Sequence, residues 1–245
     1  LFPEGSLGVN TRYQKEHGIK TTVQQVMDAA LQYHHYRCDP EVLRVLITES
    51  TRTIDEIQGM GIELRGIRTM YPKNESLMCW HLFKGGVAAV CEKFIKNIKA
   101  RGGEIHTETT ATRLITNKGR VVGVEATSPK EGKFILHAKK VIIATGGFFD
   151  NKEMREKYLR FPNADGLAQT GKTGDGIRMA WSVGAGKEGT EVQASYRPDP
   201  HGVGTTNHVS ATAKQPHLWL TPKGERFWGG LTTGMVSLDE LSDNC

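Results

Sequence analysis

A short apolar run that ends in a glycine pair constrains the fold of this chain more than any other feature. Val141 to Ala144 is continuously apolar, as a strand buried on both faces requires, and it leads into Thr145-Gly146-Gly147. Glycine lets a backbone approach a ligand closely, and open α/β sheets bind ligands where their strands end. The run therefore predicts a ligand site after a buried strand, with a plain strand-to-loop turn as the alternative.

A second glycine motif, Thr173-Gly174-Asp175-Gly176, stands at the start of a predicted helix that ends at Gly184. The backbone N–H groups and the positive end of the helix dipole favour an electron-rich ligand atom at such a position. The Asp175 carboxylate is equally suited to cap its own helix. The local pattern leaves both interpretations open.

A third glycine cluster, Gly184 to Gly189, matches the G-x-G-x-x-G pattern of nucleotide-binding loops. That motif requires a strand before it and a helix after it, so that a diphosphate meets the N-terminus of the helix. Here a predicted helix precedes the glycines and a strand-like segment follows them. We therefore interpret the cluster as the C-terminal end of a helix.

The remaining periodicity predicts three earlier helices and a group of short strands. The first helix begins at the capping box Thr22-x-x-Gln25 and runs through about Tyr36, and the second has Asp39 as N-cap and Pro40 as its first residue. Residues 1–20 are predicted to be loop and residues 62–80 irregular. A helix follows Gly85-Gly86, another covers 152–159, and strands are expected at 104–107, 110–115, 121–126 and 133–137.

Composition excludes several classes of protein. The 32 basic and 27 acidic residues are scattered rather than gathered into a patch, which argues against nucleic-acid binding. No apolar run approaches the ~18 residues of a membrane span. The four cysteines and nine histidines show no metal-ligand spacing, so no metal site is expected, and the thiols suit a cytoplasmic protein. The chain begins with Leu1 rather than Met, and we interpret it as a fragment.

The order and spacing of the first two glycine motifs resemble one family. Val141–Asn151, followed after about twenty residues by T-G-D-G, resembles the soluble fumarate reductases and their relatives in the fumarate reductase and succinate dehydrogenase flavoprotein superfamily. Glu4-Gly5-Ser6 is similar to its flavin-side loop, and His81–Gly86 to its substrate-side glycine pair. Thr109–Gly123 resembles its β-meander, and Leu218–Phe227 its N-x-x-G-x-R-F turn. The resemblance extends over nearly all 245 residues.

The resemblance implies an α/β fold with FAD as the cofactor. Residues 1–189 would form a Rossmann-like FAD-binding domain of the glutathione reductase type that lacks its first βαβ unit. Residues 190–245 would begin an α+β capping domain. The residues expected at the cofactor are Glu4, Gly5, Ser6, Ala111, Ala144, Thr145, Gly146, Gly147, Asn151, Thr173, Gly174, Asp175 and Gly176. Those expected at the substrate are Gly85, Gly86, Gln193 and Ser195.

Two departures from the family concern its catalytic groups. Fumarate reductases of the family carry Gln-Ala-His-Pro where this chain has Gln193-Ala194-Ser195-Tyr196, and their catalytic arginine corresponds here to Gly234. Glycine cannot donate a proton, so a typical fumarate reductase is not expected. Tyr196, Arg197 and Arg226 are the candidate replacements, although each also suits an ordinary structural role.

The resemblance therefore implies an FAD-dependent oxidoreductase that transfers hydride between flavin N5 and an activated C–C bond. Its substrate would be a small organic molecule, with carboxylates among the candidates, and its electron donor or acceptor is not identifiable from sequence. Two alternatives stay open: a catalytically silent fragment that cannot hold FAD by itself, and an enzyme similar to the 3-ketosteroid dehydrogenases. Since no glycine loop suits the diphosphate, we expect the chain alone to bind FAD weakly or not at all.

Overall fold

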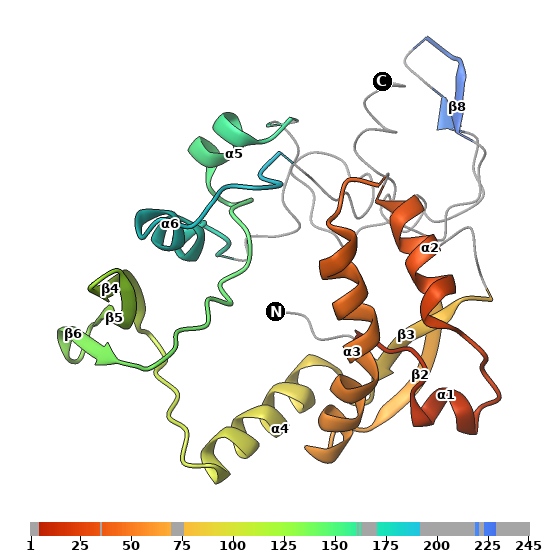
Figure 1. Ribbon diagram of the computed structural model, residues 1–245, viewed down its shortest axis with the longest axis horizontal. Helices are drawn as coiled ribbons and strands as arrows, with labels where there is room; N and C mark the ends of the chain where they lie inside the picture. The colour runs from red at the N-terminus through yellow and green to blue at the C-terminus, as the bar shows by residue number, and fades with distance from the viewer. Residues whose placement is uncertain are drawn as a thin grey trace. The chain divides into compact units, whose positions relative to one another are not determined.

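A computed structural model describes residues 5–34, 36–69, 76–160, 162, 171–191, 219–220 and 223–228 (Figure 1). The chain divides into two compact units, residues 1–105 and 106–245, and each is described by itself. The predicted domain boundary at 189/190 lies just before residues 192–218, which are outside the described part, so it stays a prediction.

The first unit is built on a three-stranded antiparallel sheet with the order β1-β3-β2. Its strands are β1 (Gly5–Leu7), β2 (Leu64–Thr69) and β3 (Met78–Phe83). Along β3, Cys79, His81 and Phe83 are buried at every second position, the period of a strand with one face on a core. The prediction that residues 62–80 are irregular is therefore wrong for 64–69 and 78–80, which belong to β2 and β3, while 70–75 lie outside the described residues. A histidine on the buried face of β3 hides the apolar alternation of that strand.

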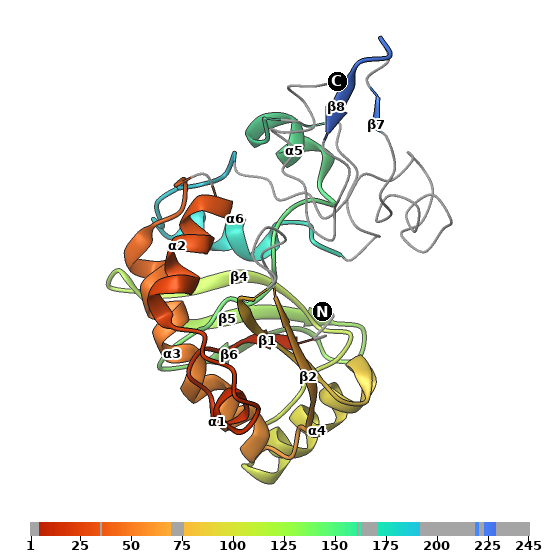
Figure 2. The same ribbon diagram turned by 90° about the vertical axis from the view of Figure 1, so that its right-hand side faces the viewer.

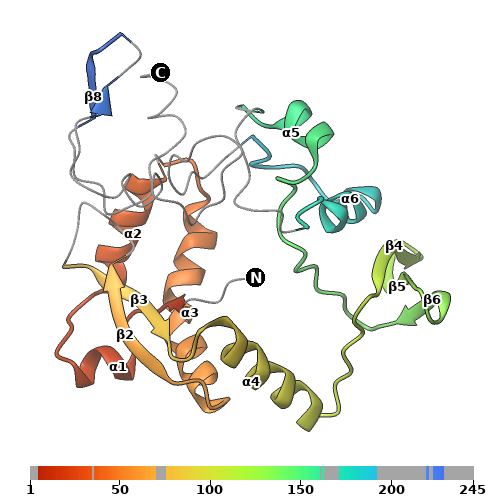
Figure 3. The ribbon, with the colours of Figure 1, turned by 180° about the vertical axis from the view of Figure 1, so that it is seen from behind.

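Four helices accompany this sheet: α1 (Arg12–Glu16), α2 (Val23–Tyr33), α3 (Pro40–Gly59) and α4 (Gly86–Ala100). The predicted starts of α2 and α3 are confirmed. Thr22 and Gln25 form a capping box, and the Asp39 carboxylate accepts from the backbone N–H of Glu41 at 2.8 Å. The first of these helices ends at Tyr33, slightly before the predicted limit. Figures 1 and 3 show α2 and α3 side by side.

The prediction that residues 1–20 form only loop is also wrong. This segment contains β1 and α1, and α1 has its own capping box, in which the Thr11 hydroxyl accepts from the Gln14 N–H at 3.1 Å. Gln14 returns the bond by accepting from the Thr11 N–H at 2.9 Å. The T-x-x-Q pattern from Thr11 to Gln14 could have predicted the start of α1. The helix is nevertheless short, and its sequence has little of the apolar periodicity by which helices are recognised.

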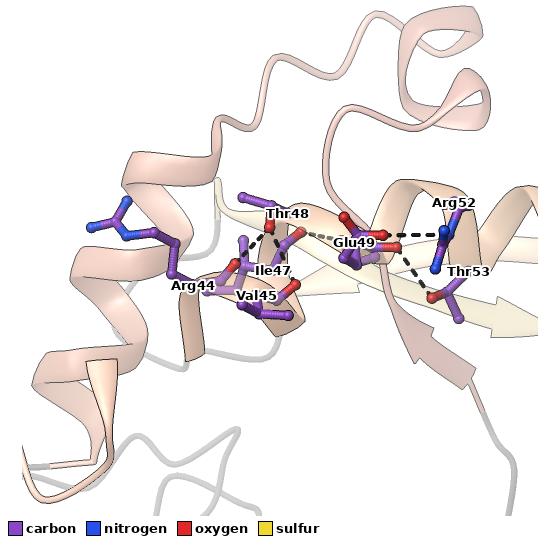
Figure 4. Close-up of polar contacts among 8 residues, drawn as sticks. Arg44, Val45, Ile47, Thr48, Glu49, Arg52 and Thr53 are labelled. Atoms are coloured by element: carbon purple, nitrogen blue, oxygen red, sulfur yellow. Dashed lines mark hydrogen bonds and ion pairs between the residues drawn. The ribbon is translucent and has the colours of Figure 1, made fainter. Parts of the chain in front are cut away.

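The solvent-facing side of α3 is held together by contacts within the helix (Figure 4). The Thr48 hydroxyl donates to the Arg44 carbonyl at 2.9 Å, and the Thr53 hydroxyl donates to the Glu49 carbonyl at 3.2 Å. Arg52 lies 3.3 Å from the Glu49 carboxylate. Attachment to the rest of the unit therefore depends on the opposite side of α3, where the buried residues are Ile47, Ser50 and Ile54.

Two apolar clusters form the core of this unit. The larger joins the end of β1, α2, α3 and β3, and its buried members are Val9, Val26, Met27, Ile47, Leu77 and Cys79. The smaller lies where α4 meets β3, with buried Ile62, Phe83 and Val90. Burying one such side chain stabilises a fold by about 1.5–3 kcal/mol. These clusters fix the helices on the sheet.

The second unit contains an antiparallel meander, shown in Figure 2, of β4 (Thr110–Asn117), β5 (Arg120–Ser128) and β6 (Gly132–His137). The three predicted strands of this meander are confirmed, but residues 104–107 form no strand, since no described segment pairs with them. Two helices, α5 (Lys152–Tyr158) and α6 (Asp175–Ser182), follow as predicted. The short strands β7 (Trp219–Leu220) and β8 (Arg226–Trp228) pair antiparallel.

The prediction of a buried strand at Val141 to Ala144 is wrong for the described part of the chain. These residues pair with no described strand, and the side chains of Ile142 and Ile143 are 91% and 39% exposed. An apolar β-branched run becomes a buried strand only where neighbouring strands lie on both sides of it. The segment therefore presents an apolar, extended stretch leading into the glycine pair.

The mixed helix and sheet content confirms the α/β class for the chain. Among the described helices, none combines the length and apolar character that crossing a membrane would demand.

Candidate functional site

The two glycine motifs that the sequence singled out lie against each other in the second unit. A β-carbon added to Gly176 would overlap the Thr145 hydroxyl, and one added to Gly174 would lie 2.8 Å from Cβ of Phe148. Real β-carbons essentially never approach other atoms below 3.0 Å. Glycine is therefore required at both positions for the start of α6 to pack on the segment that follows Ala144.

Reciprocal backbone and side-chain bonds tie the two segments together. The Asp150 N–H donates to the Lys172 carbonyl at 3.0 Å, and the Lys172 N–H donates to the Asp150 carboxylate at 2.8 Å. The Asn151 amide donates to the Thr173 carbonyl at 2.9 Å, while its Oδ1 accepts from the Met154 N–H at 3.1 Å. Asn151 thus caps α5 and holds the second motif with one side chain.

The α6 N-terminus has no side-chain cap. Its N-cap, Gly174, is left-handed with φ +79°, and the Asp175 carboxylate bonds instead to Thr173 at 2.7 Å and to Arg178. The Thr173 hydroxyl, followed by Arg178, holds the pKa of Asp175 below its usual value. The first turn of α6 therefore keeps backbone N–H groups without a side-chain acceptor, and the Asp175 carboxylate stays ionised at neutral pH.

The first motif is open to solvent. Ala144, Thr145, Gly146 and Gly147 are exposed, and a β-carbon built on Gly147 meets nothing within 4 Å. The left-handed residue of the pair is Gly146, with φ +76°. A flat ligand can therefore reach the backbone here, and the two glycines contribute differently: Gly146 by conformation and Gly147 by open space.

Ala111 belongs to the same unit. It lies on β4 opposite Ala126, next to an irregularity in the register between Ala111 and Arg113. Figure 2 shows β4 as an edge strand of the meander, and α6 packs on it. This residue, predicted at the cofactor, is therefore on the strand that contacts the helix of the second glycine motif.

The predicted residues of the first unit lie on two paired strands and a turn. Gly5 and Ser6 of β1 pair with Leu82 and His81 of β3. That strand leads to Gly85 and Gly86, which have φ +84° and +71° at the start of α4. Only glycine adopts two such successive conformations at little cost, so this turn exposes bare backbone in front of the helix.

Several predicted residues lie outside the described part of the chain: Glu4, Gln193, Ser195, Tyr196, Arg197 and Gly234. Arg226 begins β8 and pairs with Leu220 through its backbone. Their roles stay predictions.

The third glycine cluster is the helix end that the sequence predicted. Val183 is the C-cap of α6, Gly184 follows with φ +98°, and the Ala185 N–H bonds to the Ala180 carbonyl at 3.1 Å. This left-handed glycine directly after the C-cap is typical of a helix terminus. A helix rather than a strand precedes these glycines, which argues against a diphosphate loop there.

Two of the buried polar side chains in the described residues are an imidazole and a carboxylate, and the sequence-based predictions gave neither a role. His81 is fully buried in β3, and Glu125 is 6% exposed in β5, where it bonds to Arg113 at 2.9 Å and to Lys133 at 3.1 Å. The alternation of buried residues along β3 could have shown that His81 is buried. The partners of Glu125 lie on both neighbouring strands, so they can be identified only when the register of the sheet is known. No group of three or more metal-ligating side chains occurs within the described residues.

Comparison with known proteins decides the family. A family model described as "FAD binding domain" matches residues 2–242. The chain belongs to the FAD-binding domain family. Within it, the relatives are flavoproteins of the fumarate reductase and succinate dehydrogenase type, which confirms the resemblance and identifies FAD as the family's cofactor.

Individual relatives cover most of this chain. It is 29% identical over 238 residues to a vinyl phenol reductase of Lactiplantibacillus plantarum, covering 92% of this chain and 48% of the relative. It is 27% identical over 198 residues to an NADH:fumarate oxidoreductase of Klebsiella pneumoniae, covering 75% of this chain and 20% of the relative. The chain spans less than half the length of these relatives.

A solved structure shares the fold. The open conformation of a flavocytochrome c3 fumarate reductase matches with a TM-score of 0.76 and 23% identity, covering 98% of this chain and 42% of that one.

Proposed function

We propose that this chain forms part of the active site of an FAD-dependent oxidoreductase acting on an activated C–C bond of a small organic substrate. The observation that carries the proposal is the joining of Ala144–Gly147 with Thr173–Gly176 into one glycine-lined surface in the second unit. Flavin bound there would supply hydride transfer through its N5 atom.

The residues of this surface fit a flat, polar cofactor. The exposed backbone at Gly146 and Gly147 lets a ring approach without side-chain obstruction, and the N–H groups at the start of α6 offer hydrogen bonds to electron-rich atoms. Asn151 acts by holding the two segments together, since both ends of its amide are engaged within the protein. Asp175 carries negative charge beside this surface and does not supply protons, because its pKa is lowered.

Gly85 and Gly86 in the first unit, and Gln193 and Ser195 in the second, are the residues that we propose for substrate binding. Tyr196, Arg197 and Arg226 are the proposed sources of a proton. Gly234 and Ser195 stand where the family's fumarate reductases carry arginine and histidine, so we propose an activated alkene other than fumarate. The similarity to a vinyl phenol reductase supports a substrate of that kind.

Reoxidation of the photoreduced, flavin-loaded protein by candidate substrates tests this proposal. Fumarate, a vinyl phenol and a 3-ketosteroid with a C=C bond conjugated to its ketone would be compared as electron acceptors in anaerobic stopped-flow measurements. We expect the vinyl phenol to reoxidise the flavin at least about 100-fold faster than fumarate, because a missing proton donor costs about 10²–10⁴ in rate. Rapid turnover of fumarate would contradict the placement of Gly234 at the catalytic arginine.

The alternative of a catalytically silent fragment rests on one observation. The only G-x-G-x-x-G pattern of the sequence is a helix end, so the diphosphate has no evident backbone donors among these residues. Failure of saturating FAD to interact with the chain would favour this alternative. We also propose a cytoplasmic location, which the free thiols of Cys38 and Cys91 support.

A further inference from the structure

His81 is a fully buried ionisable side chain at the centre of the first unit, and the proposed chemistry makes no use of it. Its Nε2 atom lies 2.8 Å from the Thr11 hydroxyl, and the edge of the Tyr13 ring faces it with the centroids 5.9 Å apart. Its Nδ1 atom is buried and has no hydrogen-bond partner among the described residues. A buried polar atom without a partner destabilises the fold unless it carries no proton to donate or serves another purpose.

The hydrogen-bond network assigns the tautomer of this ring. The Thr11 hydroxyl accepts from the Gln14 N–H at 3.1 Å and donates to Gln14 Oε1 at 3.3 Å. Its remaining lone pair accepts a proton from His81 Nε2. A neutral ring with its proton on Nε2 therefore satisfies Thr11.

The imidazole is enclosed by several elements that it holds together. A β-carbon on Gly8 would lie 2.6 Å from Cε1 and 2.7 Å from Nδ1 of His81, so the backbone after β1 packs directly on the ring. Ser6 of β1 pairs with His81 across the sheet, and Ile67 of β2 pairs with it on the other side. The ring thus connects β3 to the end of β1 and, through Thr11, to α1.

Charged groups on these elements turn away from the ring. Glu16 of α1 binds Arg12 at 2.7 Å, and Asp55 of α3 acts on the same guanidinium. His17 stacks on Tyr13 at 4.1 Å, on the exposed side of α1. A second proton on the ring would therefore bring a positive charge into a fully buried site, opposed only in part by a hydrogen bond with the Cys79 backbone. Burial lowers the pKa of His81 to about 4, against the opposing effect of the Cys79 backbone.

We propose that His81 is a proton-sensitive positioning residue: its neutral ring holds β1 and α1 in place on β3, and its protonation releases both. Acid then moves Gly5 and Ser6 of β1, which the resemblance implies on the flavin side. The release of β1 and α1 does not depend on the proposed function.

The direction and size of the effect follow from linkage. A histidine with a pKa near 6.5 when exposed and about 4 when buried stabilises the closed form fully above pH ~6.5. Between pH ~6.5 and ~4 the opening equilibrium rises about tenfold for each unit of acidification, and below pH ~4 it levels off.

Amide hydrogen exchange of the whole chain tests the proposal. Exchange in the peptide covering residues 5–16 would be followed from pH 7.5 to 4.5 and corrected for the intrinsic rate at each pH. His81→Gln retains an amide donor for Thr11 and removes the titration. Thr11→Val removes the hydroxyl that pairs with the ring but leaves the ring titratable. His137→Gln, an exposed histidine on β6, is the matched control.

We expect protection of residues 5–16 to be constant above pH ~6.5 and to fall about tenfold per pH unit below it in the wild type and in His137→Gln, and to stay nearly flat throughout in His81→Gln. Thr11→Val should show reduced protection already at pH 7.5, with the pH slope retained. The proposal is overturned if His81→Gln keeps the wild-type slope, or if the loss of protection spreads evenly over the first unit.

Discussion

Gly176, in the first turn of α6, lies directly against Thr145, and the space between them has no room for a methyl group. A β-carbon on Gly176 would overlap the Thr145 hydroxyl and would also meet Cγ2 of Ile143 at 2.5 Å. This contact joins the two glycine motifs into one surface, and its geometry leads to the first prediction.

Gly176→Ala should destabilise the second unit by about 1–3 kcal/mol, the usual cost of overpacking a tight contact. Urea denaturation followed by the fluorescence of Trp181, which lies on α6, measures the effect. Gly186→Ala is the matched control, because a β-carbon there meets nothing within 4 Å and the residue does not have a positive φ. An equal loss of unfolding free energy in the two variants would contradict the direct packing of α6 on Thr145.

Asn151→Ala should cost about 1–2 kcal/mol, since it removes the cap of α5 and the bond to the Thr173 carbonyl. Asn151→Asp separates the two contributions: it keeps an oxygen for the Met154 N–H and loses the donor to Thr173. We expect Asn151→Asp to retain α5 but to loosen residues 171–174, as measured by amide exchange. Wild-type exchange in that loop would contradict the proposed tie between the motifs.

Glu125 should make the meander sensitive to acid. Hydrogen bonds from Arg113 first, and then from Lys133, lower the pKa of Glu125 to about 2 in the folded chain, against a usual value of 4.5. A lowered carboxyl pKa means that its stabilising contribution is present above pH ~4.5 and is lost as the pH falls toward 2.

Glu125→Gln should therefore lower the midpoint of thermal unfolding at pH 7, and the difference from wild type should shrink between pH ~4.5 and ~2. Glu131→Gln, at an exposed turn position, is the control and should leave the midpoint nearly unchanged. A difference between Glu125→Gln and wild type that stays constant over this pH range would argue against an ionised Glu125 in the sheet.

The sequence predicted those elements whose signals are local. Capping boxes, N-terminal proline and terminal glycine located α2, α3, α4 and α6, and tight turns located the meander. The same local rules distinguished the helix end at Gly184 from a nucleotide loop, which the left-handed glycine after Val183 bears out. The spacing of the two glycine motifs also predicted the residues that the fold brings together around Thr145 and Gly176.

The errors arose where structure depends on distant partners. β1 and β3 stabilise each other across a long sequence separation, and β3 carries a buried histidine whose partner, Thr11, lies on α1. At Val141–Ala144 the sequence predicted a strand that the described structure does not contain. An apolar β-branched run has strand propensity, but it forms a strand only when a neighbouring strand accepts and donates its backbone hydrogen bonds. Gly146 rather than Gly147 has the left-handed conformation, a distinction that sequence alone does not provide.

The central claim, that the joined glycine motifs face the flavin, is tested most directly by an amide-exchange footprint with FAD. The chain would be compared with and without millimolar FAD, a concentration chosen because no glycine loop suited to the diphosphate is evident in the sequence. We expect FAD to protect residues 144–147 and 171–178, and Gly146→Val to abolish this protection, since a branched side chain is strained at φ +76° and blocks the approach. Protection confined to residues 184–189, or no protection of the two motifs in a chain that binds FAD, would contradict the account.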